Sequence, residues 1–151
     1  MVRRVGELLI RKGTTVLTVD RNSTVIEAVR LMNREGVGSL LVMDGDPRPI
    51  GIITERDVLR QVVDPGLSAE LTPIEEIMSS PPITIASTAT AVEAMRTMTD
   101  QRVRHLPVID EGRMIGIISI GDVMKAITEC LEQDIEQLES YITGSVSIPV
   151  A

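Results

Sequence analysis

The chain has almost no aromatic residues. Among its 151 residues there is one tyrosine, Tyr141, and neither phenylalanine nor tryptophan. Proteins that hold single-stranded nucleic acid commonly stack bases on aromatic side chains, so the sequence argues against that class. A core must be built from aliphatic residues, alanine and methionine, and an apolar content of 43% is enough for one. An adenine ring bound by this chain would therefore lie between aliphatic walls.

Cysteine and histidine are equally scarce, with Cys130 and His105 as the single examples. A lone cysteine cannot form a disulfide within the chain, which favours a reducing compartment, and we expect a cytoplasmic location. One histidine and one cysteine cannot build a histidine-rich metal site or a convincing catalytic triad. The glycine-rich fingerprints of nucleotide-hydrolysing and dinucleotide-binding enzymes are missing as well. The sequence therefore predicts a protein that is not an enzyme and holds no metal.

Basic residues are outnumbered by acidic ones, and the net charge is −7 with a pI of about 4.7. Such a surface repels phosphate backbones and anionic lipid, which argues against binding to long nucleic acids or to membranes. No apolar run approaches the 18 or so residues that a membrane-spanning helix needs. The first eight residues are too short and too charged to be a signal peptide.

One motif occurs twice. Gly51-Ile-Ile-Thr-Glu-Arg-Asp57 recurs 65 positions later as Gly116-Ile-Ile-Ser-Ile-Gly-Asp122. Both copies read glycine, two isoleucines, a hydroxyl residue, two variable residues and aspartate. If a buried strand ends at the hydroxyl residue, the aspartate lies in the first turn of the next helix. Hydroxyl and carboxylate then converge, and such a pair suits sugar hydroxyls and phosphate oxygens.

The repeat extends beyond the motif, which is the signature of a duplicated structural unit. Four further residues recur at a separation of 66, namely Thr18, Glu27, Met32 and Asp44, as Thr84, Glu93, Met98 and Asp110. The separation falls to 65 only after the loop at residues 45–49. A single residue gained or lost in a loop is well tolerated, so the register supports two related halves.

Each half is predicted to be β-α-β-β-α. Strands are expected at residues 16–19 and around Thr84, at 40–43 and 106–109, and at 50–53 and 115–118. Capping-box patterns at Thr24 and Thr90 open the first helix of each half, and Gly36 ends the earlier one. Residues 5–10 and 74–78 are expected to form short helices that lead into the two halves.

These elements give an organisation in four parts. The first repeat covers residues 5–65, a linker covers 66–73, the second repeat covers 74–128, and a helical extension and tail cover 129–151. A unit of about 55 residues seldom covers its own hydrophobic face, so we expect the two halves to pack sheet against sheet.

The last predicted helix outruns the repeat and continues to Thr143 and Gly144. Its apolar residues follow helical spacing: Met124, Ile127, Leu131, Ile135, Leu138 and Ile142. The stripe can cover the chain's own core or contact a second subunit, and the sequence leaves both possibilities open.

These residues resemble the cystathionine-beta-synthase (CBS) domain pair, also called a Bateman module. The resemblance covers residues 5–128 and rests on the two motif copies and on Arg104-His-Leu-Pro-Val-Ile-Asp110. The end of the chain looks like that of stand-alone CBS-pair proteins. The resemblance implies an α/β (α+β) fold of two βαββα repeats with pseudo-twofold symmetry and sheets packed face to face. It also implies two crevices for adenosine nucleotides and assembly as a homodimer.

The resemblance assigns roles to the repeated polar residues. Asp57 and Asp122 correspond to the carboxylate that binds the ribose hydroxyls, and Thr54 and Ser119 to the hydroxyl that contacts ribose or phosphate. The alternative is that these residues only begin helices. Four other positions are counted as ligand-binding, with the two threonines at the adenine end: Thr18, Thr84, Pro107 and Ile120.

The two halves differ in the residues that the resemblance assigns to the phosphate end of the ligand. Arg104 and His105 stand where nucleotide-sensing members place basic residues, whereas the first half has Gly38 and Ser39 there. We therefore expect unequal crevices, with Gly38 beside a ligand and Arg56 as a further phosphate contact. The alternatives are that His105 is an ordinary half-buried histidine and that Arg104 forms an ion pair on the surface.

The expected function is regulatory. An adenosine nucleotide (AMP, ADP, ATP or NAD(H)) enters a crevice between the halves, their relative angle changes, and an unknown target protein responds. Two alternatives stay open: a sensor of S-adenosylmethionine, and a dimerisation or interaction scaffold that binds no nucleotide.

Overall fold

The computed structural model describes residues 2–13 and 15–143 of the chain. The first half contains α1 (Val5–Lys12), β1 (Thr18–Asp20), α2 (Val25–Glu35), β2 (Ser39–Met43), β3 (Gly51–Thr54), α3 (Glu55–Val58) and a π-helical turn η1 (Leu59–Val63). The second half contains a 3-10 turn η2 (Ile74–Glu76), α4 (Ala91–Gln101), β4 (His105–Asp110), β5 (Arg113–Ser119) and α5 (Ile120–Thr143). The end of the predicted tail, from Gly144 to residue 151, lies outside the described residues.

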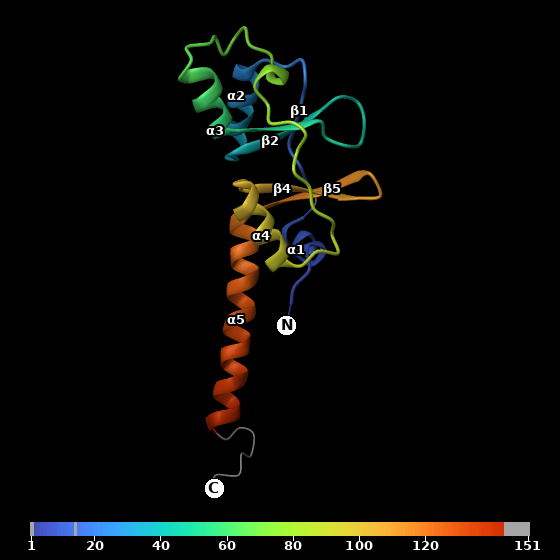
Figure 1. Cartoon of the computed structure of the whole chain (residues 1–151), viewed down its shortest axis with the longest axis vertical. Helices are drawn as coiled ribbons and strands as arrows, with labels where there is room; N and C mark the ends of the chain where they lie inside the picture. Colours follow the sequence, from blue (N-terminus) through green and yellow to red (C-terminus); the bar gives the residue numbers. More distant parts are fainter. Residues whose placement is uncertain (1, 14, 144–151) are drawn as a thin grey trace.

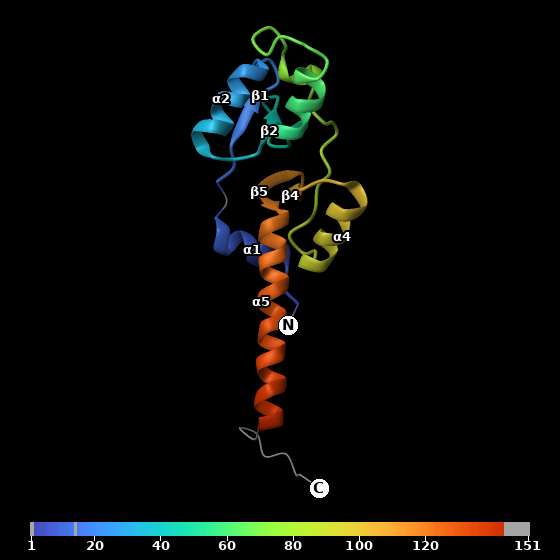
Figure 2. The same ribbon diagram turned by 90° about the vertical axis from the view of Figure 1, so that its left-hand side faces the viewer.

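The two halves are stacked along the long axis of the molecule, with their strands toward the middle (Figure 1). Helix α5 leaves the second half and projects away from the body in both views (Figures 1 and 2). Within the part of the chain that the structure describes, no helix is both long and apolar enough to cross a bilayer.

The predicted helix ends are confirmed. Thr24 and Glu27 form a capping box at the start of α2, and Thr90 and Glu93 form its counterpart at the start of α4. Each box satisfies backbone N–H groups that the first turn of a helix leaves without partners. Gly36 ends α2 in the left-handed conformation, with φ of 67°. The equivalent position after α4 is Arg102, which adopts φ of 55° despite its side chain.

Both predicted hairpins are present, because β2 pairs antiparallel with β3 and β4 pairs antiparallel with β5. The predicted strand around Thr84 is shorter than expected. β1 is a strand parallel to β2, whereas its counterpart makes only an isolated bridge between Ile85 and Val108. The reason is Pro107, which stands where the first half has Leu41. The N–H of Leu41 donates to the carbonyl of Leu17 at 3.2 Å, and proline has no N–H to repeat that bond.

The hydrophobic interior consists of two clusters, one in each half, and their composition was not predicted. Val5, Leu8 and Leu9 of α1 are buried in the cluster of the second half. Ile74 and Ile77, expected to lead into the second half, are buried in the cluster of the first half. The segment that leads into each repeat thus completes the core of the other one, which ties the halves together.

This exchange explains the glycine that opens each motif. A Cβ atom on Gly51 would lie 2.6 Å from the sulfur of Met78 and 3.0 Å from the carbonyl oxygen of Ser79. A Cβ atom on Gly116 would lie 2.6 Å from Cδ2 of Leu9. The two distances of 2.6 Å are shorter than a Cβ atom tolerates, so a side chain at either glycine would force its neighbour to move. The motif therefore begins with glycine because the exchanged segment crosses directly over that position.

We expect Gly51→Ala to lower the free energy of unfolding by about 1–3 kcal/mol, the usual cost of overpacking a well-filled site. Denaturation by urea, followed by circular dichroism, measures the change. Gly121→Ala is the matched control, since a Cβ atom there meets nothing closer than Ser119 Oγ at 3.6 Å. Equal stability of the Gly51→Ala variant and the parent would contradict the role of this close approach.

Candidate functional site

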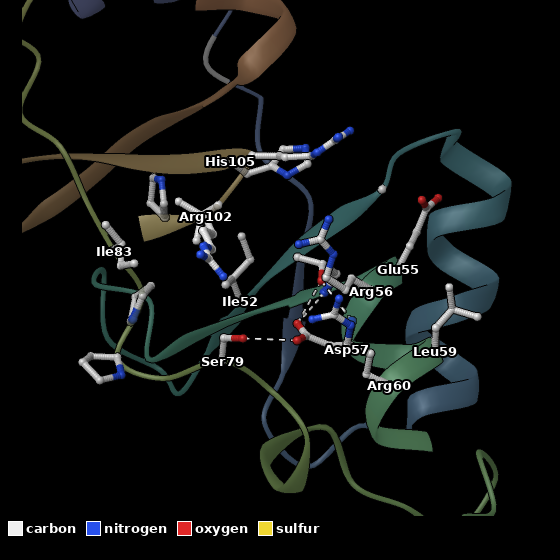
Figure 3. Close-up of a pocket in the computed structure, with 17 residues that line it drawn as sticks. Ile52, Glu55, Arg56, Asp57, Leu59, Arg60, Ser79, Ile83, Arg102 and His105 are labelled. Atoms are coloured by element: carbon white, nitrogen blue, oxygen red, sulfur yellow. Dashed lines mark hydrogen bonds between the residues drawn. The ribbon is translucent and has the colours of Figure 1, made fainter. Parts of the chain in front are cut away.

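A cavity of about 630 Å³ lies between the two halves. Its walls come from the β3–α3 junction, from residues 79–83 and from the turn between α4 and β4, as Figure 3 shows. Seven of the residues predicted from the sequence line it: Gly38, Thr54, Arg56, Asp57, Arg104, His105 and Pro107. The remaining predicted residues are not among those that line it: Thr18, Thr84, Ser119, Ile120 and Asp122.

The carboxylate of Asp57 is held at the start of α3 by a capping box with Thr54. Thr54 is the N-cap, and its N–H donates to Asp57 Oδ2 at 3.0 Å. The N–H of Asp57 donates to Thr54 Oγ1 at 3.2 Å. Ser79 Oγ donates to the other carboxylate oxygen, Oδ1, at 3.2 Å (Figure 3). Thr54 Oγ1 also donates to Oδ2 at 3.0 Å. Every one of these donors is neutral. Because two carboxylate oxygens offer about four acceptor positions, Asp57 retains capacity for about one hydroxyl group of a sugar.

The polar lining beyond Asp57 is mostly cationic. Arg56 and Arg60 come from the first half, and Arg102 and Arg104 come from the turn before β4. Figure 3 shows Arg102 on the opposite side of the cavity from Asp57. Guanidinium groups match phosphate oxygens in a fork geometry and stay charged at all physiological pH values. Arginines from both halves can therefore converge on one anionic group.

His105, the first residue of β4, lines the same cavity as these arginines. Burial lowers the pKa of its imidazole below the ordinary value, and the positive charge of Lys12 lowers it further. The negative charges of Asp122 and Glu55 oppose this lowering without overcoming it. The imidazole is thus mostly neutral at pH 7, and it can donate one hydrogen bond to an anion while adding little charge.

The rest of the wall is apolar. It includes Ile52, Pro81, Pro82, Ile83, Val103 and Pro107. A purine would be held between these aliphatic surfaces, as the absence of phenylalanine and tryptophan requires. The site thus offers a carboxylate, an apolar slot and a group of arginines, which are the three contacts that a nucleotide needs.

Several lining residues were missed by the sequence analysis. Arg60 and Arg102 flank predicted residues, so the neighbourhood of the motif was a usable signal for them. Ser79 and residues 81–83 were not predictable in the same way. They follow the exchanged segment, and its position against the first half depends on contacts far apart in the chain.

The second copy of the motif has different surroundings. The N–H of Ser119 donates to Asp122 Oδ2 at 2.8 Å, and the N–H of Asp122 donates to Ser119 Oγ at 3.2 Å. Lys12 adds an ion pair to the same carboxylate at 2.6 Å. Partial burial raises the pKa of Asp122, but the hydrogen bonds from Lys12 and Ser119 outweigh it, so the pKa lies below its usual value.

Asp122 lines a separate cavity of about 260 Å³ between α1 and α5. The other charged residues around it are Arg3, Arg11, Lys12, Lys125 and Glu129. It contains only two aliphatic residues, Leu8 and Ala126. The two motif copies thus share their backbone design and differ in what surrounds the carboxylate.

Comparisons with known proteins agree on one family. The family model of the CBS domain matches residues 5–64 and 74–129. The chain is 39% identical over 148 residues to the mitochondrial CBS domain-containing protein CBSX3 of Arabidopsis thaliana, covering 93% of this chain and 72% of that one. It also matches two longer Arabidopsis thaliana proteins with CBS domains, CBSCBSPB5 and CBSCBSPB4, at 33% identity, but spans only 26% of their length.

Two solved structures are informative. A CBS-domain containing protein from Agrobacterium tumefaciens is 36% identical with a TM-score of 0.77, covering 82% of this chain and 98% of that one. A CBS domain protein from Pyrobaculum aerophilum, solved in complex with AMP, is 30% identical with a TM-score of 0.69, covering 79% of this chain and 88% of that one.

Proposed function

The chain belongs to the CBS-domain family, and we propose that it is a regulatory protein that binds an adenosine nucleotide in the cavity between its two halves. The observation that carries this proposal is that Asp57, an apolar wall and arginines of both halves line one cavity, with Arg102 of the second half opposite Asp57 (Figure 3). The AMP complex of the similar Pyrobaculum aerophilum protein supports the same class of ligand. AMP, ADP, ATP and NAD(H) all present a ribose and phosphate to such a site.

The charge of the lining favours these ligands over S-adenosylmethionine. Four arginines face the cavity, against the two carboxylates of Glu55 and Asp57. S-adenosylmethionine carries a positive sulfonium and no phosphate, so the arginines would repel its sulfonium and lack a phosphate to bind. The S-adenosylmethionine sensor is therefore the weaker alternative.

A signalling mechanism follows from the fact that both halves of the chain contribute residues to the nucleotide site. Asp57 and Arg56 belong to the first half, and Arg104 and His105 belong to the second, so one nucleotide contacts both. A ligand can shift a conformational equilibrium only by its difference in affinity between the two arrangements. A nucleotide that bridges the halves meets this condition, because its contacts depend on their relative position. We propose that a partner protein responds to that position and that the chain itself catalyses no reaction.

We expect AMP, ADP, ATP or NADH to raise the melting temperature by several degrees. A ligand at 100 times its dissociation constant adds about 2.7 kcal/mol to the free energy of unfolding. Thermal melts with each nucleotide at millimolar concentration measure the shift, with S-adenosylmethionine and inorganic phosphate as comparisons. A flat response to every nucleotide would favour the scaffold alternative.

One observation favours the scaffold alternative, namely a stripe of exposed apolar side chains on α5. The stripe on the projecting part of the helix consists of four residues that are each more than half exposed, namely Leu131 (57%), Ile135 (53%), Leu138 (62%) and Ile142 (74%). Exposed apolar side chains in a continuous stripe mark an interaction surface. The stripe begins beyond Val123 and Ala126, which are buried in the chain's own core. The projecting part of α5 therefore does not cover the core of its own chain.

We propose that this stripe contacts α5 of a second copy in a homodimer. Leu131, Ile135, Leu138 and Ile142 are spaced four, three and four residues apart, which is the seam of a coiled coil. Isoleucine alternates with leucine along that seam. When isoleucine occupies the a positions and leucine the d positions, parallel pairs of helices are favoured. The dimer and the nucleotide site are compatible, since α5 projects away from the two halves (Figure 1) and contributes no residue to the lining of the cavity between them.

The cellular compartment stays a prediction. The lone cysteine favours reducing surroundings, and we propose a cytoplasmic location on that basis. The similar Arabidopsis thaliana protein is described as mitochondrial.

A further inference from the structure

Lys12, the last residue of α1, reaches across to the second copy of the motif. Its ammonium donates to the carbonyl oxygen of Ile117 at 3.1 Å and to Asp122 Oδ2 at 2.6 Å. The side chain of Lys12 is 35% exposed and that of Asp122 is 27% exposed, so the pair is partly shielded from water.

The first half makes the same two contacts with a neutral residue. The N–H of Ser79 donates to the carbonyl oxygen of Ile52 at 2.9 Å, and Ser79 Oγ donates to Asp57 Oδ1 at 3.2 Å. Ile52 and Ile117 occupy the same position of the motif, as do Asp57 and Asp122. One ammonium group in the second half thus replaces a backbone N–H and a hydroxyl in the first.

The replacement changes what each carboxylate can bind. The carboxylate of Asp57 accepts hydrogen bonds only from neutral donors, the N–H and hydroxyl of Thr54 and the hydroxyl of Ser79, so no cation is among those partners. Asp122 is paired with a cation at 2.6 Å. Hydrogen bonds in which both groups are charged are shorter and stronger than those from a hydroxyl. A sugar that approaches Asp122 must therefore compete with an ammonium group that is already in place.

The space beside Asp122 also disfavours the binding of a nucleotide there. The cavity of about 630 Å³ is lined by both the hydroxyl residue and the aspartate of the first motif copy, Thr54 and Asp57, whereas the cavity of about 260 Å³ is lined by Asp122 without Ser119. Sites for ligands of nucleotide size usually measure about 300–1,000 Å³ and are mostly apolar. The smaller cavity falls below that range, and most of its lining residues are charged.

We propose that Lys12 closes the second copy of the motif to nucleosides, so that each chain binds one nucleotide, at Asp57. This inference rests on the proposed function and adds the number of sites and the residue that sets it. The duplicated motif then has two roles: one copy binds ligand, and the other anchors α1 to the second half.

Isothermal titration calorimetry with AMP tests the inference. The unmodified protein binds about one AMP per chain, and Asp57→Asn loses that binding. Lys12→Met raises the stoichiometry toward two, because Asp122 becomes available and the aliphatic part of the side chain is kept. Arg11→Met is the matched control on the same helix. It removes the ion pair with Glu129 at 2.6 Å and leaves the stoichiometry at one.

The outcomes separate the two proposals. Two equivalent AMP molecules on the unmodified protein, or one AMP retained by Asp57→Asn, would overturn the role of Lys12 and leave nucleotide binding intact. A Lys12→Met variant that folds like the parent and still binds one AMP would overturn it too. The stoichiometry of the unmodified protein decides the question even if Lys12→Met does not fold. Absence of binding in all four proteins would overturn the proposed function, and this inference with it.

Discussion

Replacement of Asp57 by alanine should weaken AMP binding by about 10- to 100-fold. Donors on Thr54 and Ser79 occupy three of the roughly four acceptor positions of the carboxylate, which leaves one for a sugar hydroxyl, and a hydrogen bond to a charged group contributes roughly 1.5–3 kcal/mol. Loss of that bond corresponds to about one to two orders of magnitude in the dissociation constant. Titration calorimetry on the parent and the variant measures the difference directly.

Asp57 also closes the capping box of α3, so its replacement carries a structural cost. Loss of a cap typically lowers the free energy of unfolding by about 0.5–2 kcal/mol. Asp57→Asn keeps the shape and an oxygen acceptor while removing the charge, and circular dichroism shows whether each variant is folded. A folded Asp57→Asn protein with the affinity of the parent would show that the site has been wrongly assigned.

Glu55 provides the control within the same cavity. It is a second carboxylate in the lining, and it lies next to arginines that are proposed to bind phosphate. Glu55→Ala removes a negative charge from the anion-binding end, so we expect AMP to bind at least as tightly as it does to the parent. A loss of affinity equal to that of Asp57→Ala would mean that Glu55 contacts the ligand as well and that Asp57 is not the distinguishing carboxylate of the site.

The double replacement of Ile135 and Leu138 by glutamate should convert the proposed dimer into a monomer. Both side chains lie on the exposed seam of α5, and a dimer would bury the two new charges without partners. An unpaired buried charge costs far more than a helical seam of this length can offset. Sedimentation equilibrium of the parent and the variant measures the change in mass.

Gln133→Glu is the control, because it adds one negative charge to the same stretch of helix on the face away from the seam. A parent protein that sediments as a monomer would contradict the homodimer. A variant that stays dimeric would place the interface elsewhere on the molecule. The seam is flanked by Glu132 and Glu139, so a monomeric parent would instead favour a basic partner helix.

Local features of the fold were predictable because they depend on residues a few positions apart. The spacing alone predicts two capping boxes, one formed by Thr24 and Glu27 and the other by Thr90 and Glu93. Gly36 predicts the left-handed turn that ends α2. The same holds for Thr54 and Asp57, whose mutual contact follows from a strand that ends in a helix. Thr54 and Asp57 of the motif therefore line one end of the cavity, and their role in ligand binding stays a prediction.

Other features depend on contacts between distant segments, which periodicity does not reveal. Nothing in residues 5–12 indicates that α1 packs on the second half or that Lys12 meets Asp122. The weak first strand of the second half is an intermediate case. Pro107 lacks an N–H, so the missing bond to that strand could have been inferred once the two halves had been aligned residue by residue.

The exchange of leading segments means that neither copy of the repeat is self-sufficient. Excision of one copy would remove Val5, Leu8 and Leu9 from one interior, or Ile74 and Ile77 from the other, and leave an unfilled hollow. A gene fusion that carries this CBS pair into a longer protein must accordingly transfer both copies in a single piece.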